Sequence, residues 1–244
     1  MANWSDPRTV GSAPAVDVGS RSAAYDAGLR SYMLSVYNYM ASGVLLTGVV
    51  ALLFASSGAA QSIMVGPGLL KWLIVFAPLA FILAMNFGIN RMSTFTLQAC
   101  FWGFATVMGL SMSTIFLVYT GTSIAQTFFA TAAAFMGLSL WGYTTKKDLS
   151  GFGTFLIMGL VGLIVASIIN IFLQSGTMSL VISFIGVLLF AGLTAYDTQK
   201  IKSVYAYVAG TEMVGKSVVM GALELYLDFI NMFMFLLRFM GNRD

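Results

Sequence analysis

Four ionisable side chains lie inside or at the edge of long apolar stretches, where charge is costly. They are Arg91, Asp197, Glu224 and Asp228. Insertion scales put one charge at a helix centre at about 2.5–3.5 kcal/mol, so such residues usually serve ion or proton pathways. Glu224 and Asp228 are four residues apart on one helix face, where two like charges need a cavity, a shared proton or a cation. The sequence therefore predicts chemistry with protons or cations.

Some of these residues also have a simpler interpretation. Arg91 and Asp197 stand at helix ends and can extend to the aqueous interface. Glu224 is close enough to an interface to face lipid head groups. Asp228 does not fit this interpretation, because it lies eleven residues past Ser217, about 16 Å into the layer.

The rest of the composition excludes most familiar catalytic sites. The chain has no histidine and one cysteine, Cys100, which excludes His-based zinc sites, Ser-His-Asp triads and an intrachain disulfide. Proton sensing near neutral pH then falls to carboxyl groups. Only 9% of the 244 residues are charged and 59% are hydrophobic, with a mean hydropathy of +0.89. These values exclude a soluble enzyme and a nucleic-acid-binding protein, and we expect an integral membrane protein that is not an enzyme.

Charge-free runs define the helices that must position the ionisable groups. Runs at 31–70, 72–90, 92–145 and 149–196 contain no charged residue. A span needs about 20 apolar residues, so the last two runs hold two spans each, with breaks at 120–122 and 175–177. The sequence predicts an all-α protein with one transmembrane domain at 31–244, behind a flexible polar cytoplasmic tail at 1–30. The seven predicted helices are about 34–56, 71–91, 96–119, 122–142, 152–174, 178–199 and 217–238.

The placement of basic residues predicts the orientation. Nine of the twelve Lys and Arg residues fall in the tail or in the loops after the second, fourth and sixth spans. The positive-inside rule makes that side cytoplasmic, with the N-terminus inside and the C-terminus outside. Arg91, Asp197 and Glu224 then meet in the inner half of the membrane. Asp228 lies about three turns deeper than Asp197, unless the sixth helix continues through 201–208 and carries Asp197 inward.

Three stretches of the sequence resemble a known family. The chain from about residue 25 onward is similar to the Bax inhibitor family, specifically its bacterial YccA-like branch. The stretches are 25–30, 191–199 and 223–231. The most specific pair is the Tyr196-Asp197-Thr198-Gln199 motif, followed about thirty residues later by Leu225-Tyr226-Leu227-Asp228-Phe229.

The resemblance implies a fold and a function. The implied fold has six helices around a central seventh, and the implied function is a pH-sensitive passive calcium leak in a bacterial inner membrane. The family's pH sensor is an aspartate pair on the sixth and seventh helices, which corresponds to Asp197 and Asp228. An arginine on the second helix that latches to the first aspartate corresponds by position to Arg91.

Two carboxyl groups in a poorly solvated site do not readily both ionise, so we expect the pair to titrate as a unit and to share one proton. Arg91 competes for Asp197, so protonation decides how the last helix packs. Glu224 and Asn231 are secondary candidates along the ion path. Calcium takes about six to eight oxygens, and Asp197, Asp228 and Glu224 supply fewer, so we expect weak binding and passage rather than storage. No cofactor is expected, since calcium enters as the permeant ion.

Two other functions fit the same residues. Some bacterial relatives in this family modulate a membrane-bound AAA protease through the N-terminal tail, so a non-transporting regulator of the stress and cell-death suppressor type is one alternative. A proton-coupled ion transporter is the other, and it would show saturation and counter-transport. The expected partners are the lipid bilayer, calcium ions and protons, with the protease as partner in the regulator alternative and nucleic acid in none.

Overall fold

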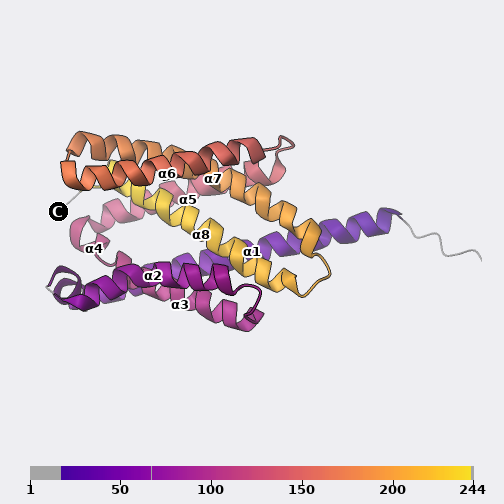
Figure 1. The fold of residues 1–244 in the computed structure, drawn as a ribbon, viewed down its shortest axis with the longest axis horizontal. Helices are drawn as coiled ribbons and strands as arrows, with labels where there is room; N and C mark the ends of the chain where they lie inside the picture. The colour runs from indigo at the N-terminus through magenta and orange to yellow at the C-terminus, as the bar shows by residue number, and fades with distance from the viewer. Residues whose placement is uncertain (1–17, 67, 243–244) are drawn as a thin grey trace, which may run out of the picture.

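The computed structural model describes residues 18–66 and 68–242, and every element in these ranges is a helix (Figure 1). Seven helical segments there are long and apolar enough to cross a membrane, with α3 and α4 forming one span. The predicted all-α, seven-span architecture is confirmed. The elements are α1 (Val18–Ser56), the π-helix η2 (Gln61–Val65), α2 (Leu69–Gly88), α3 (Thr94–Met112), α4 (Ile115–Val118), α5 (Gly121–Thr144), α6 (Ser150–Leu173), α7 (Gly176–Val208) and α8 (Met213–Met240).

Hydroxyl side chains begin three of these helices. Ser93, Thr120 and Ser175 precede α3, α5 and α7, and each accepts a hydrogen bond from a backbone N–H of the first turn. Such caps satisfy donors that have no partner inside the helix. The breaks predicted at 120–122 and 175–177 are confirmed, because α5 begins at Gly121 and α7 at Gly176.

Two helices, α1 and α7, are longer than predicted by more than two turns, and both differences affect the site. α1 begins at Val18, so part of the tail expected at 1–30 is helical, while residues 1–17 lie outside the described ranges. α7 continues through Val208, the extension that brings Asp197 toward the level of Asp228. Tyr205 on α7 contacts the rings of Tyr25 and Tyr32 on α1, with ring centroids 5.2 Å apart in both pairs.

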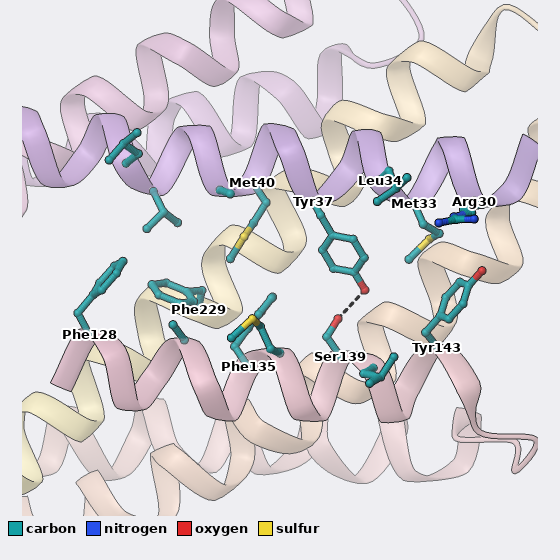
Figure 2. Close-up of a pocket in the computed structure, with 16 residues that line it drawn as sticks. Arg30, Met33, Leu34, Tyr37, Met40, Phe128, Phe135, Ser139, Tyr143 and Phe229 are labelled. Carbon is teal, nitrogen blue, oxygen red and sulfur yellow. Dashed lines mark hydrogen bonds between the residues drawn. The ribbon is translucent and has the colours of Figure 1, made fainter. Parts of the chain in front are cut away.

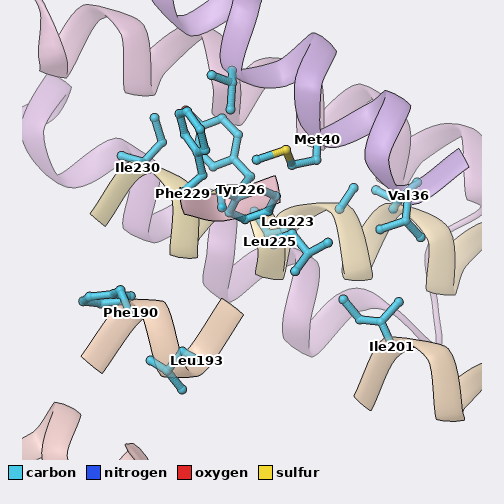
Figure 3. Close-up of a cluster of buried hydrophobic side chains, with 14 of the residues drawn as sticks. Val36, Met40, Phe190, Leu193, Ile201, Leu223, Leu225, Tyr226, Phe229 and Ile230 are labelled. Carbon is cyan, nitrogen blue, oxygen red and sulfur yellow. The ribbon is translucent and has the colours of Figure 1, made fainter. Parts of the chain in front are cut away.

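The C-terminal helix α8 lies at the centre of the bundle. It packs against α7, α1, α5 and α3, and in Figure 1 it crosses between the α6–α7 pair and the α2–α3 pair. The core side chains around it come from several helices, as Figure 3 shows for Tyr226 and Phe229 of α8, Val36 and Met40 of α1, and Phe190 of α7. The resemblance-based expectation of a central last helix is therefore confirmed. Asp228, on the buried part of α8, is therefore held away from water and from lipid.

Candidate functional site

Asp197 and Asp228 face each other across the α7–α8 pair. Because α7 ends at Val208 and α8 begins at Met213, the two acids lie about 16 Å and 22 Å from the turn that joins the helices. Their carboxyl groups are within hydrogen-bonding reach of each other. Asp228 is buried, with 4% of its surface exposed, and its Oδ2 receives no hydrogen bond from any donor in the described residues. Two carboxylates cannot donate to each other, so a bond between them requires a proton on one.

Lys200 supplies the positive charge at this site. Its Nζ lies 2.9 Å from Oε1 of Glu224 and 3.8 Å from Oδ1 of Asp197. The side chain of Lys200 is 43% exposed and that of Asp197 is 15% exposed, so this ion-pair cluster forms the more exposed edge of a site whose inner member is Asp228. Both ion pairs among the described residues involve Lys200.

Arg91 does not reach the acid pair. α2 ends at Gly88, and Arg91 is exposed in the turn that follows, with no ion pair among the described residues. The expectation that Arg91 latches to Asp197 is therefore corrected, because Asp197 pairs with Lys200 instead. The physical reason is that α2 packs chiefly against α3 rather than α7, so its end lies elsewhere in the bundle. The contact between α2 and α8 at this end comes from Lys216, whose Nζ donates to the carbonyl oxygen of Ile89 over 3.0 Å.

The remaining acids and amides do not complete a calcium site. No group of three or more acidic, histidine or cysteine side chains in the described residues is arranged to hold a metal ion. The expected weak calcium ligation by Asp197, Asp228 and Glu224 together is therefore not seen, because Glu224 is drawn to Lys200. Asn231 donates its amide to the carbonyl oxygen of Leu227 in its own helix, over 2.8 Å.

The neighbours of Asp197 in its motif fix α7 against α5 and α6. Thr198 exchanges a hydrogen bond of 2.8 Å with Ser139 on α5. Gln199 accepts the backbone N–H of Leu149 at 2.9 Å and donates to the carbonyl oxygen of Lys147 at 2.8 Å, which ties α7 to the α5–α6 loop. These contacts explain why the motif residues flank the acid: they set the position and rotation of α7.

Glycines bring the helices close enough for these contacts. A Cβ on Gly142 of α5 would collide with the carbonyl oxygen of Ala195, and one on Gly153 of α6 would collide with the ring of Tyr196. Small residues allow close helix packing in membranes, where no hydrophobic force draws helices together. Asp197 is thus held on a helix that packs closely against α5 and α6.

A second polar contact holds α8. Tyr226 is fully buried, and its hydroxyl lies 2.7 Å from Oγ1 of Thr47 on α1. Thr47 donates its single hydroxyl proton to the carbonyl oxygen of Ala105 on α3, over 2.8 Å. Tyr226 is therefore the donor to Thr47. These two hydrogen bonds join α8, α1 and α3 about half a turn from Asp228.

Sequence reasoning missed Lys200, Ser139 and Thr47 as members of the site. Lys200 carries a usable signal, since it stands three residues after Asp197 on the same helix face. Ser139 and Thr47 carry none, because a hydroxyl residue in an apolar helix most often bonds to its own backbone. Their partners are 59 and 179 residues away in the chain.

Comparisons with known proteins agree with this architecture. A family model described as "Inhibitor of apoptosis-promoting Bax1" matches residues 29–244. The chain is 49% identical over 225 residues to the uncharacterized protein RP147 of Rickettsia prowazekii, which covers 92% of this chain and 94% of that protein. It is 46% identical over 230 residues to an uncharacterized protein of Caulobacter vibrioides, covering 90% and 92%. It is 43% identical over 219 residues to the inner membrane protein YbhL of Escherichia coli, covering 89% and 94%. The chain is an integral membrane protein and belongs to the Bax inhibitor family.

Proposed function

We propose that this protein is a pH-sensitive passive calcium leak, gated by the Asp197–Asp228 pair. One observation carries the proposal: Asp228 is buried at the centre of the bundle, faces a second carboxyl group, and has an oxygen without a donor. A charged carboxylate in that position has a high free-energy cost, which a proton removes, so we take protonation of Asp228 to be part of the function. The choice of calcium as the permeant ion comes from the activity that the family resemblance implies.

The mechanism follows from the protonation of the pair. With one shared proton, the two carboxyl groups bond α7 to α8 across the bundle. Without it, two like charges meet in a poorly hydrated site, and the nearby cation, Lys200, is already shared with Glu224. The interaction between the two carboxyl groups therefore changes from attractive to repulsive when the proton is lost, which is a local charge event acting on a helix pair. Asp228 is shut off from water in this structure, so the leak requires the two helices to move relative to each other.

We also propose that the protein lies in a bacterial inner membrane with its N-terminus in the cytoplasm and its C-terminus outside. The start of α1 and the α2–α3, α5–α6 and α7–α8 connections lie at one end of the bundle (Figure 1). That end carries most of the basic residues, which the positive-inside rule places in the cytoplasm.

Calcium flux into dye-loaded proteoliposomes, measured over a range of pH, tests the proposed function. We expect the wild-type flux to vary with pH and the variants Asp197→Asn and Asp228→Asn each to lose that dependence, because an amide cannot titrate. Asp148→Asn is the matched control, since it removes an exposed loop carboxylate and should keep the wild-type profile. An unchanged pH profile in both pair variants would refute gating by the pair. Absence of flux would favour the protease regulator, and saturation with counter-ion dependence would favour a proton-coupled transporter.

A further inference from the structure

A deep groove separates α1 from α5 on the side of the bundle that faces the membrane. Its volume is about 840 Å³, and Phe229 of α8 contributes to its lining. The groove exists because α1 and α5 both pack on α8 and each also packs on a different neighbour, α3 and α7 respectively. In Figure 2, α1 and α5 run along opposite sides of the groove, joined by the hydrogen bond of 2.6 Å between Tyr37 and Ser139.

The walls of the groove are apolar over most of its length. Leu45 on α1 and Met136 on α5 line it and are 69% and 65% exposed, so they face whatever fills the groove or surrounds it. Both helices are membrane spans, so the neighbouring medium is hydrocarbon. Water or a non-helical polypeptide segment in this place would bring polar groups that the apolar walls cannot satisfy. A hydrocarbon chain fits this lining.

The groove is also long enough for an acyl chain. Its lining on α1 runs from Arg30 to Leu45, a rise of about 22 Å, which exceeds one leaflet of a hydrocarbon core about 30 Å thick. A smaller cavity of about 290 Å³ shares Val44, Phe128 and Phe229 with it and continues the opening toward Ala51. The apolar opening therefore extends deeper into the layer than its larger part alone.

One end of the groove is cationic. Arg30 lines that end, is exposed and forms no ion pair among the described residues. Tyr143 lies on the opposite wall at the same end (Figure 2). Lys202 is not itself part of the lining, but it lies 4.8 Å from the centre of the Tyr143 ring and donates to the carbonyl oxygen of Tyr143 over 2.7 Å. This leaves two ammonium protons of Lys202 for another acceptor. Asp26, one turn before Arg30 on the same helix, does not pair with it.

We propose that this groove binds one acyl chain of an anionic glycerophospholipid, whose phosphate group lies between Arg30 and Lys202. The apolar walls account for the chain, and the two cations at one end account for the charge of the head group. The proposal does not depend on the calcium leak, since neither Asp197 nor Asp228 lines the groove.

Native mass spectrometry tests the proposal with the full chain in mild detergent, offered equal amounts of phosphatidylglycerol and phosphatidylcholine with the same acyl chains. We expect one retained lipid, with preference for phosphatidylglycerol. Arg30→Gln should reduce that preference about fivefold, the effect of one basic residue on an anionic lipid. Ala41→Trp, which adds a ring to an exposed lining position, should reduce retention of both lipids.

Two control variants leave the groove intact. Lys71→Gln removes a cation at the start of α2, and Ala133→Trp adds a ring to an exposed position of α5 outside the lining. Both should retain lipid as the wild type does. Equal retention in all four variants, or no preference between the two lipids, would overturn the proposal and indicate surface lipid alone.

A second measurement uses the unaltered protein, so it does not depend on the folding of any variant. Phosphatidylglycerol with a photoactivatable acyl chain should label peptides of α1 and α5 together. Labelling of α6, whose surface faces the membrane outside the groove, at the same yield would overturn the proposal.

Discussion

The hydrogen bond between Tyr226 and Thr47 should hold α8 to α1 and α3 by a measurable free energy. Tyr226 donates to Thr47, and Thr47 donates to the carbonyl oxygen of Ala105, so the two hydroxyls have distinct roles. Thr47→Val keeps the side-chain shape but leaves the buried hydroxyl of Tyr226 without an acceptor. Tyr226→Phe removes the donor and leaves Thr47 bonded to Ala105.

These roles set the expected magnitudes. A buried donor left without a partner costs about 1–3 kcal/mol, so Thr47→Val should lower the free energy of unfolding by that amount. Tyr226→Phe should cost about 0.5–1.5 kcal/mol, the net contribution of one hydrogen bond. The double variant has no stranded hydroxyl, so it should cost less than the sum. The interaction energy should lie near 0.6 kcal/mol and below about 1.7 kcal/mol, the range of interhelical hydrogen bonds measured in membranes.

Unfolding in mixed micelles of rising sodium dodecyl sulfate content, followed by far-ultraviolet circular dichroism, gives the four free energies. Thr106→Val is the matched control, because its hydroxyl bonds to the carbonyl oxygen of Trp102 in its own helix. Thr106→Val combined with Tyr226→Phe should be additive within about 0.3–0.5 kcal/mol. The same additivity in the Thr47–Tyr226 cycle would refute the assigned hydrogen bond.

Three further outcomes are expected. Gly142→Ala should lower the free energy of unfolding by about 1–3 kcal/mol, because the added Cβ meets the carbonyl oxygen of Ala195. Gly137→Ala, whose Cβ meets no atom within 4 Å, should be neutral or stabilising. Equal effects of the two substitutions would contradict the close approach at Gly142. Hydrogen bonds from the Ser150 hydroxyl and backbone N–H hold the pKa of Asp148 below its ordinary value of about 3.9. The stabilisation from these bonds is therefore fully present above the ordinary pKa, and it is lost as the pH falls through the lowered pKa of the folded protein. A carboxyl titration by nuclear magnetic resonance should show this low pKa and its partial return in Ser150→Ala; no change on substitution would count against the bond. A C-terminal reporter that is active only in the cytoplasm should be silent, and an active reporter would reverse the proposed orientation.

The sequence by itself determined the span architecture and the acids of the site. Hydrocarbon requires about 20 apolar residues per helix, so charge-free runs locate the spans with little help from packing. The hydroxyl and glycine breaks before α5 and α7 follow from local capping chemistry. Asp197 and Asp228 stood out because charge at membrane depth is rare and costly.

Only the tertiary structure decided which groups surround those acids. Lipid and the bundle core are both apolar, so hydrophobic pattern does not say which helix lies beside which. That ambiguity placed Arg91 beside Asp197 in the prediction, whereas α2 packs against α3 and Lys200 takes the position near the acid. The hydrogen bonds between Ser139 and Thr198 and between Tyr226 and Thr47, and the groove between α1 and α5, have the same origin. They arise from contacts between distant parts of the chain, whose residue types look ordinary in isolation.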